Sequence, residues 1–258
     1  MKAIAILLTA AVFSHPVWAQ ESNGEQRSNH YLDHVMLGVS DLEAGMAAFR
    51  ERTGVKPRKD GRNAALGTES AIVGLGDNTF LEIIAPDPKA DPGIIDPDLK
   101  HLVYDRLGAM DELTPFRWAI GTSNLERTTS FMRRASNRPS PIMAGSRERG
   151  WGRMLDWQWA RVIVPESMVT PFFIQWDDVE KRPQQRARGD CSLDALHVNS
   201  RNYKALLNLV VAMQVDIDLV GSDVDSLSFE LDCPAGEVVF DHADLTIYYE
   251  PPPRPSTR

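Results

Sequence analysis

Two residues with acid–base chemistry lie inside otherwise apolar runs of the sequence. His34 lies in the run 31–39, and Glu82 lies in the run 79–85. A carboxylate in such a run must be paired with a cation, bound to a metal ion or turned toward a wet cavity, because an unpaired buried charge is costly. Glu82 is therefore a candidate cleft residue with a catalytic role. His34 has a simpler alternative, which is a hydrogen-bonded position in the core.

A stretch rich in glycine, arginine and tryptophan occupies positions 147–159. Arginine can hold an anionic group by paired hydrogen bonds, and tryptophan can stack on a flat ligand. The stretch could line the mouth of a cleft, and Arg149 and Trp151 are its candidate substrate contacts. The alternative is a solvated hairpin whose aromatic side chains belong to the core.

Several familiar catalytic motifs are missing from the sequence. No Gly-x-Ser-x-Gly element is present, so serine hydrolase chemistry has no support. The segment 74–76 holds two glycines but is too short for a nucleotide-binding motif. The chain has two cysteines, Cys191 and Cys233, which excludes a zinc site built from two cysteine pairs.

The elements that must position these residues follow a repeated order of strand, helix and further strands. In the first unit an apolar strand over 31–39 precedes a helix that Ser40 or Asp41 caps and Gly54 ends, and a hairpin over 69–85 follows. The same order begins again at Phe116 and at Ser192. The predicted modules cover residues 31–88, 115–177 and 191–249. A period of about 80 residues indicates an internal duplication.

The two ends of the chain lie outside these modules. Residues 1–19 have a positive charge, an apolar run and a small residue at position 19, which is typical of a secretory signal. We expect cleavage there, no transmembrane anchor afterwards, and a periplasmic or secreted protein. Export would permit a disulfide between the two cysteines, and two free buried cysteines are the alternative. Residues 20–30 form a polar lead, and 251–258 form a proline-rich tail expected to be disordered.

Composition and charge narrow the class of protein further. The 258 residues carry a net charge of −8, with 43% hydrophobic and 25% charged residues. These fractions are ordinary for a folded soluble protein. An acidic balance argues against nucleic acid as the main partner, because no net positive field would attract phosphates. We expect a small-molecule ligand instead, and a homodimer is one assembly that the sequence allows.

Several segments of the first module carry a family resemblance. The segments 32–35, 38–45 and 52–55, followed by 67–68, 71–76 and 80–88, resemble the first module of the vicinal oxygen chelate superfamily, in its glyoxalase-like domain branch. The segment 171–176 is similar to the end of the second module. The resemblance implies an α+β fold of paired βαβββ modules, as in glyoxalase, bleomycin-resistance and dihydroxybiphenyl dioxygenase proteins. Their curled mixed sheets surround a cleft.

The resemblance also implies a divalent metal, which could be Zn, Mn, Fe or Ni. The family positions for its ligands fall on His34 and Glu82, and imidazole and carboxylate are normal ligands for these ions. The second module has Trp118 and no histidine on its first strand, and Gln175 on its last strand is a poor metal ligand. His197, on the first strand of the third unit, could replace the missing ligand, or it could be an ordinary strand histidine.

Two functions are compatible with these observations. The first is a metal-dependent lyase, isomerase or dioxygenase that acts on a small oxygenated molecule. In this reading Glu82 and Gln175 take part in catalysis, Trp118 joins the two candidate substrate contacts of the 147–159 stretch, and His34, Glu82 and His197 bind the metal. The second is a metal-free periplasmic protein that binds or sequesters a small molecule in the same cleft.

Overall fold

A computed structural model describes residues 30–76, 79–134, 138–162, 169–187, 191–242 and 245. The signal segment, the tail, all of the polar lead except His30 and all of the strand expected over 245–249 except Leu245 lie outside these residues. Within them, no helix is long and apolar enough to cross a membrane.

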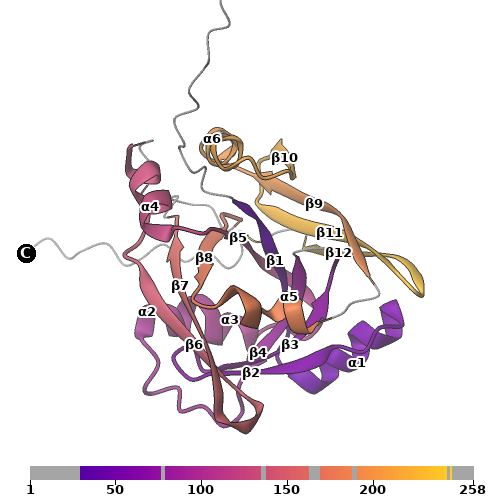
Figure 1. Ribbon diagram of the computed structural model, residues 1–258. Coiled ribbons are helices and arrows are strands. Elements are labelled where there is room, and N and C mark those ends of the chain that lie inside the picture. The colour runs from indigo at the N-terminus through magenta and orange to yellow at the C-terminus, as the bar shows by residue number, and fades with distance from the viewer. Residues whose placement is uncertain are drawn as a thin grey trace, which may run out of the picture.

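The first two units together form an eight-stranded closed barrel, and a short helical segment connects them (Figure 1). The first unit consists of β1 (Tyr31–Gly38), α1 (Leu42–Thr53), β2 (Arg58–Asn63), β3 (Thr68–Gly74) and β4 (Phe80–Pro86). The connection is α2 (Pro97–Leu99), η1 (Lys100–Tyr104) and α3 (Asp105–Leu107). The second unit consists of β5 (Thr114–Gly121), α4 (Leu125–Arg134), β6 (Met143–Arg149), η2 (Gly150–Gly152), β7 (Arg153–Arg161) and β8 (Phe172–Trp176).

Local signals explain where the helices begin and end. The Asp41 side chain accepts a hydrogen bond from the backbone of the first turn of α1, and Gly54 ends that helix with a φ of 75°. A left-handed residue at this position is most readily a glycine, because glycine has no Cβ. Asn124 accepts a bond from Arg127 N at 2.9 Å and caps α4. The predicted ends of α1 are therefore confirmed, with Asp41 rather than Ser40 as its cap.

The two units pair in the same way and then join edge to edge. Strand β1 is parallel to β4 and β5 is parallel to β8, while the antiparallel pairs β1–β5 and β2–β6 close the barrel. Gly61 permits the second closure, since a Cβ at this position would lie 2.3 Å from the Glu148 carbonyl oxygen. These pairings confirm the predicted α+β fold with a curled mixed sheet, which here closes around its interior.

The third unit has the predicted order of elements but a different pairing. It follows η3 (Val179–Lys181) and α5 (Pro183–Arg186), and it consists of β9 (Ser192–Ser200), α6 (Tyr203–Met213), β10 (Asp218–Gly221), β11 (Ser226–Cys233) and β12 (Gly236–His242). Its strands form a separate four-stranded sheet, in the order β10-β9-β11-β12. The first strand, β9, is parallel to the second strand, β10, whereas β1 is parallel to the fourth strand of its unit.

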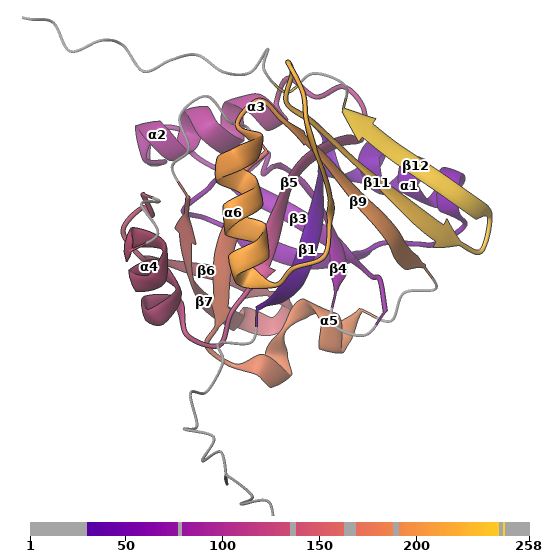
Figure 2. The same cartoon turned by 90° about the horizontal axis from the view of Figure 1, so that it is seen from above.

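The four-stranded sheet packs against the outside of the barrel, beside α1 and β5 (Figures 1 and 2). Phe49 of α1 stacks on Phe240 of β12, with ring centroids 5.7 Å apart. Apolar residues of the sheet, of α1 and of the barrel's outer face form one continuous hydrophobic core. The described residues of the third unit therefore shield the outside of the barrel and contribute no strand to it.

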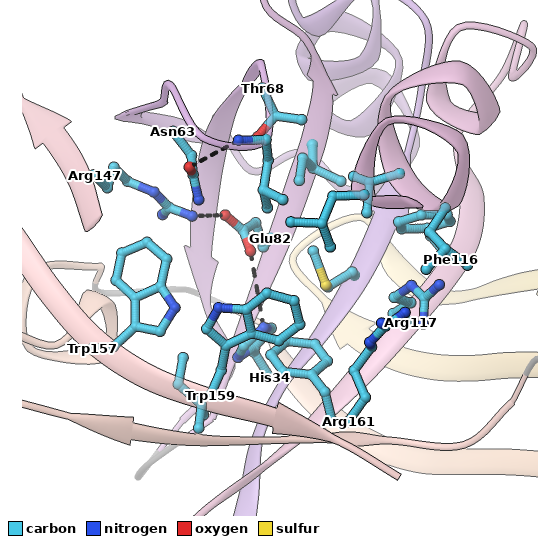
Figure 3. A pocket seen from close by; sticks show the side chains of 18 of the residues that line it. His34, Asn63, Thr68, Glu82, Phe116, Arg117, Arg147, Trp157, Trp159 and Arg161 are labelled. Carbon is cyan, nitrogen blue, oxygen red and sulfur yellow. Dashed lines mark hydrogen bonds and ion pairs between the residues drawn. The ribbon is translucent and has the colours of Figure 1, made fainter. Parts of the chain in front are cut away.

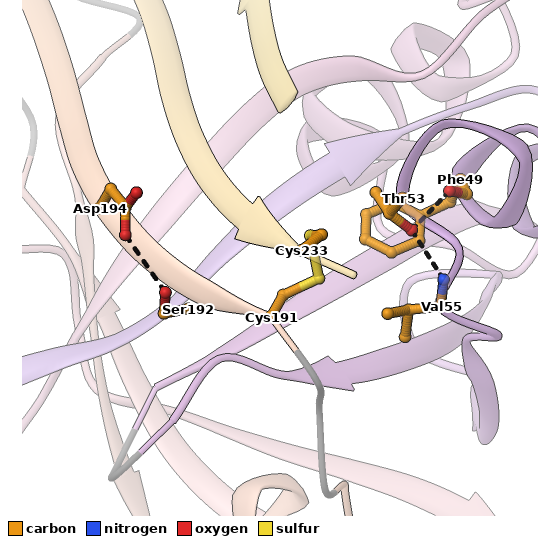
Figure 4. The surroundings of a disulfide bond; sticks show 7 residues. All are labelled: Phe49, Thr53, Val55, Cys191, Ser192, Asp194 and Cys233. Atoms are coloured by element: carbon orange, nitrogen blue, oxygen red, sulfur yellow. Dashed lines mark hydrogen bonds between the residues drawn. A yellow bond between two sulfur atoms is a disulfide. The ribbon is translucent and has the colours of Figure 1, made fainter. Parts of the chain in front are cut away.

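A disulfide joins Cys191, directly before β9, to Cys233 at the end of β11 (Figure 4). Its Cα atoms are 4.2 Å apart. The next turn is tied to α1, because Ala235 N donates to the Thr53 carbonyl oxygen at 3.2 Å. The described cysteines are thus paired, which decides between the two alternatives that the sequence left open.

Candidate functional site

The interior of the barrel holds a pocket of ≈ 90 Å³. Strands of both units and the α2–η1 segment contribute to its wall (Figure 3). The apolar part of the wall includes Met36, Ile84, Val103, Phe116 and Phe172. The polar part is dominated by His34, Glu82 and three arginines, Arg117, Arg147 and Arg161. The pocket is therefore apolar with a few charged groups turned inward, which is the usual make-up of a small-molecule site.

His34 is held in the pocket wall by its neighbour in sequence. The pairing of β1 with β5 shifts register between Leu32 and His34, so that Asp33 lies at a bulge. Asp33 Oδ1 lies 2.7 Å from His34 Nδ1, and both side chains are buried. The second oxygen of Asp33 accepts a hydrogen bond from Trp176 Nε1 at 2.9 Å. A carboxylate only accepts, so the shared proton belongs to Nδ1, and in the neutral imidazole the Nε2 atom is then an acceptor.

Glu82 lies next to this histidine and is tied to the opposite side of the barrel. Its Oε2 atom is 3.9 Å from His34 Nε2, and its Oε1 atom accepts a hydrogen bond from Arg147 (Figure 3). Arg147 also donates to Asp60 Oδ2 at 2.7 Å, and Arg149 lies 3.1 Å from Asp60 Oδ1. Two carboxylates and two guanidinium groups therefore form one buried and charge-balanced network.

The pKa values within this network follow from its charges. Burial alone would raise the pKa of Asp60, but the guanidinium groups of Arg147 and Arg149 outweigh burial and hold the pKa below its ordinary value. Burial would likewise lower the pKa of Arg147, and the carboxylates of Glu82 and Asp60 raise it instead. The ion pairs thus keep these groups charged inside the protein.

A family model described as the glyoxalase-like domain matches residues 32–213. This range contains both barrel units and the first two elements of the third unit, β9 and α6. The chain belongs to the glyoxalase-like domain family. The resemblance to glyoxalase-like domains inferred from the sequence is therefore confirmed. No curated protein sequence matches this glyoxalase-like chain.

Several solved structures are similar to this chain at low sequence identity. A hypothetical protein from Staphylococcus aureus has a TM-score of 0.59 and 14% identity, over 82% of this chain and 85% of that chain. A methylmalonyl-CoA epimerase from Mycobacterium tuberculosis has a TM-score of 0.39 and 18% identity, over 56% of this chain and 86% of that one. A methylmalonyl-CoA epimerase in complex with methylmalonyl-CoA and NH4+ has a TM-score of 0.40 and 16% identity, over 58% of this chain and 97% of that one. The first of these supports the fold of the glyoxalase-like chain.

The metal implied by the family can be tested against the side chains of the pocket. His34 and Glu82 offer two donors, but one oxygen of Glu82 is bound to a guanidinium group. In the described parts of the chain, no group of three or more His, Cys, Asp or Glu residues could hold a metal ion. Catalytic metal sites normally take three protein ligands. This donor set does not fit such a site.

Two predicted site residues on strands of the second unit point away from the pocket. Gln175 accepts a hydrogen bond from Leu125 N at 2.7 Å and so caps α4, while its neighbours Ile174 and Trp176 line the pocket. Trp118 is fully buried in the outer core, where its Nε1 atom donates to the Val169 carbonyl oxygen. Successive strand residues face opposite sides, so an alignment error of one residue exchanges the inside for the outside. The predicted roles of Gln175 and Trp118 at the site are corrected accordingly.

The other predicted residues lie elsewhere in the glyoxalase-like fold. Arg149 is buried behind the pocket, where it pairs with Asp60 and supports Arg147 indirectly. Trp151 lies in the turn between β6 and β7 and is 97% exposed. His197 lies on the four-stranded sheet, 3.1 Å from Asp218 and 3.2 Å from Glu230. His197 therefore does not lie in the pocket with His34 and Glu82, because the third unit forms its own sheet outside the barrel.

Three site residues were missed by the reasoning from sequence. The sequence-based predictions assign no role to Asp33, Arg117 or Arg161. Arg117 lies in the apolar strand 116–121, so the argument that marked Glu82 as unusual applies equally to it. The same argument applies to Asp33, because it is a charged residue that precedes His34 within one apolar run.

Proposed function

We propose that this glyoxalase-like protein binds a small organic molecule inside its barrel and catalyses a proton transfer on it, as a lyase or isomerase that uses His34 as general base. One observation supports this proposal most directly. His34 is held by Asp33 through Nδ1, and its Nε2 atom belongs to the pocket wall beside Glu82. An oriented imidazole with a free acceptor nitrogen is the common arrangement for a general base.

The proposed step removes a proton from a carbon next to a carbonyl group. The C–H bond breaks and the proton forms a bond with Nε2. The C–H electron pair becomes the C=C bond of an enolate, and the π electrons of the carbonyl group move to its oxygen. The imidazolium is stabilised by Asp33 on one side and by Glu82, 3.9 Å away, on the other. Return of the proton to a carbon gives isomerisation, and departure of a neighbouring group gives elimination.

Proton exchange with deuterated water measures this step directly. Small ketones, 2-oxoaldehydes and 2-oxo acids are incubated with the protein in D2O, and the loss of C–H signals is followed by proton NMR. We expect exchange with at least one of these compounds, slowed about 10²–10⁴-fold by His34→Asn. His101→Asn is the matched control, because His101 is exposed and does not line the pocket. Asp33→Asn should slow exchange with little effect on substrate affinity.

The results separate this proposal from its alternatives. Exchange that survives dialysis against a chelator supports the acid–base proposal. Exchange that disappears with the chelator and returns with Mn, Fe, Ni or Zn salts would refute it in favour of the metal-dependent enzyme. Binding of small molecules without any exchange would favour the metal-free binding protein, for which the largely apolar pocket wall is the supporting observation.

We also propose that the protein is exported to the periplasm or secreted. The disulfide between Cys191 and Cys233 supports this location, because disulfides persist in oxidising compartments. The predicted signal over residues 1–19 supports it independently. Mass spectrometry of the protein purified from the periplasm or the medium would test both, since the mature chain should then begin at Gln20.

A further inference from the structure

Two arginines enter the pocket at a distance from the ion-paired network. Figure 3 shows Arg117 and Arg161 close together beside Phe116, away from Arg147 and Glu82. The register explains this placement, since Arg161 pairs with Phe172 on β8 and Phe172 pairs with Ala119 on β5. Arg117 lies two residues from Ala119, so its side chain is on the same inner face of the barrel.

These arginines lack the partners that Arg147 has. In the described parts of the chain, the Nε atoms of Arg117 and Arg161 are buried and have no hydrogen-bond partner. Arg106 of α3 adds a third positive charge nearby. Burial, assisted by the charges of Arg106 and Arg161, lowers the pKa of Arg117 to about 9. Burial also lowers the pKa of Arg161, although the carboxylates of Asp96 and Asp98 oppose this shift. Arg117 therefore remains charged at neutral pH, and an anion in the pocket would offset the cost of burying its guanidinium group.

We propose that Arg117 and Arg161 bind the carboxylate of a small organic acid whose apolar body fills the rest of the pocket. A guanidinium group matches a carboxylate by two parallel hydrogen bonds. The wall between the arginines and His34 is apolar, with Met36, Ile84 and Phe172, which suits a carbon skeleton. The volume of ≈ 90 Å³ favours a compact molecule. This inference rests on the pocket of the proposed function and names its substrate class.

Ligand binding measured by calorimetry and by thermal shift tests the inference without any assay of catalysis. The probes are butyrate and benzoate, their neutral amides butyramide and benzamide, and inorganic phosphate. We expect the two carboxylates to bind and to raise the melting temperature. Either Arg117→Met or Arg161→Met should weaken carboxylate binding by about tenfold or more. Arg133→Met is the matched control, because Arg133 is exposed on α4 and should change nothing.

The unliganded variants provide a second readout that does not depend on the choice of probe. Arg117→Met removes one charge from a cluster of like charges, so its melting temperature without ligand should be equal to or higher than that of the parent. A marked decrease would mean that Arg117 holds the fold together through an anionic partner of the protein itself, and would overturn the inference.

The remaining outcomes are also decisive. Equal binding of acids and amides, binding of phosphate alone, or full carboxylate binding by both arginine variants would each refute the carboxylate site. His34→Asn should keep carboxylate binding, which separates this inference from the proposed catalysis. Carboxylate binding without proton exchange would refute the role of His34 as a base and leave the anion site supported. Proton exchange that is unaffected by Arg117→Met would refute the anion site and leave the role of His34 supported.

Discussion

Substitution of Arg147 by methionine should destabilise the protein more than any ordinary surface change. The Arg147 side chain is 8% exposed, and it joins Glu82 to Asp60 across the barrel. Methionine keeps much of the side-chain volume and removes the charge. Asp60 retains Arg149 as a partner, whereas Glu82 keeps, among the described residues, only the ion pair with His34 at 3.9 Å. An uncompensated buried charge costs about 3–5 kcal/mol.

This loss of free energy corresponds to a measurable decrease in the melting temperature. A domain of this size loses roughly 2–4 °C of melting temperature per kcal/mol, so a decrease of about 6–20 °C is expected. Urea unfolding followed by tryptophan fluorescence gives the free energy itself. The double variant Arg147→Met/Glu82→Gln should recover at least half of the loss, because the orphaned charge is then gone. Arg133→Met, an exposed substitution of the same kind, should stay within about 0.5 kcal/mol of the parent.

Two results would contradict this reasoning. A loss below about 1 kcal/mol for Arg147→Met would place the ion pair in the range of solvent-exposed pairs, in conflict with its burial. A double variant no more stable than the single one would mean that the cost came from lost packing rather than from the unpaired carboxylate of Glu82.

Other perturbations test the remaining structural claims. Replacing Cys191 and Cys233 by serine should cost about 4 kcal/mol by the loop-entropy estimate, given their separation of 42 residues, and urea unfolding with and without reductant checks this. The lowered pKa of Asp60 adds stability above about pH 4 that is lost as the pH falls through the folded-state value, and the Asp60→Asn variant should flatten that part of an unfolding curve measured against pH. Gln175→Ala should lower stability by about 1 kcal/mol through the lost cap of α4 and leave carboxylate binding unchanged, so altered binding would contradict its outward position. Gly61→Ala should loosen the β2–β6 closure and expose the pocket, which faster amide hydrogen exchange in β2 and β6 would report.

The sequence was informative where the signal was local. The apolar runs identified the strands, Asp41 and Gly54 marked the ends of α1, and the repeated order of elements indicated the fold class. Glu82 could be recognised as a site candidate because the cost of burying a charge depends on its immediate neighbours in a strand. The same rule, applied more widely, would have pointed to Arg117.

The tertiary structure decided everything that depended on register and on distant partners. Glu82 and Arg147 are 65 residues apart, and only the closure of the barrel brings their side chains together. Whether Gln175 or Ile174 faces the pocket depends on a single residue of strand register. Likewise, His197 lies outside the site because β9 pairs with β10 and β11 and takes no place in the barrel. Apolar patterning determines that a residue lies in a strand, whereas the pairing of strands determines what its side chain meets.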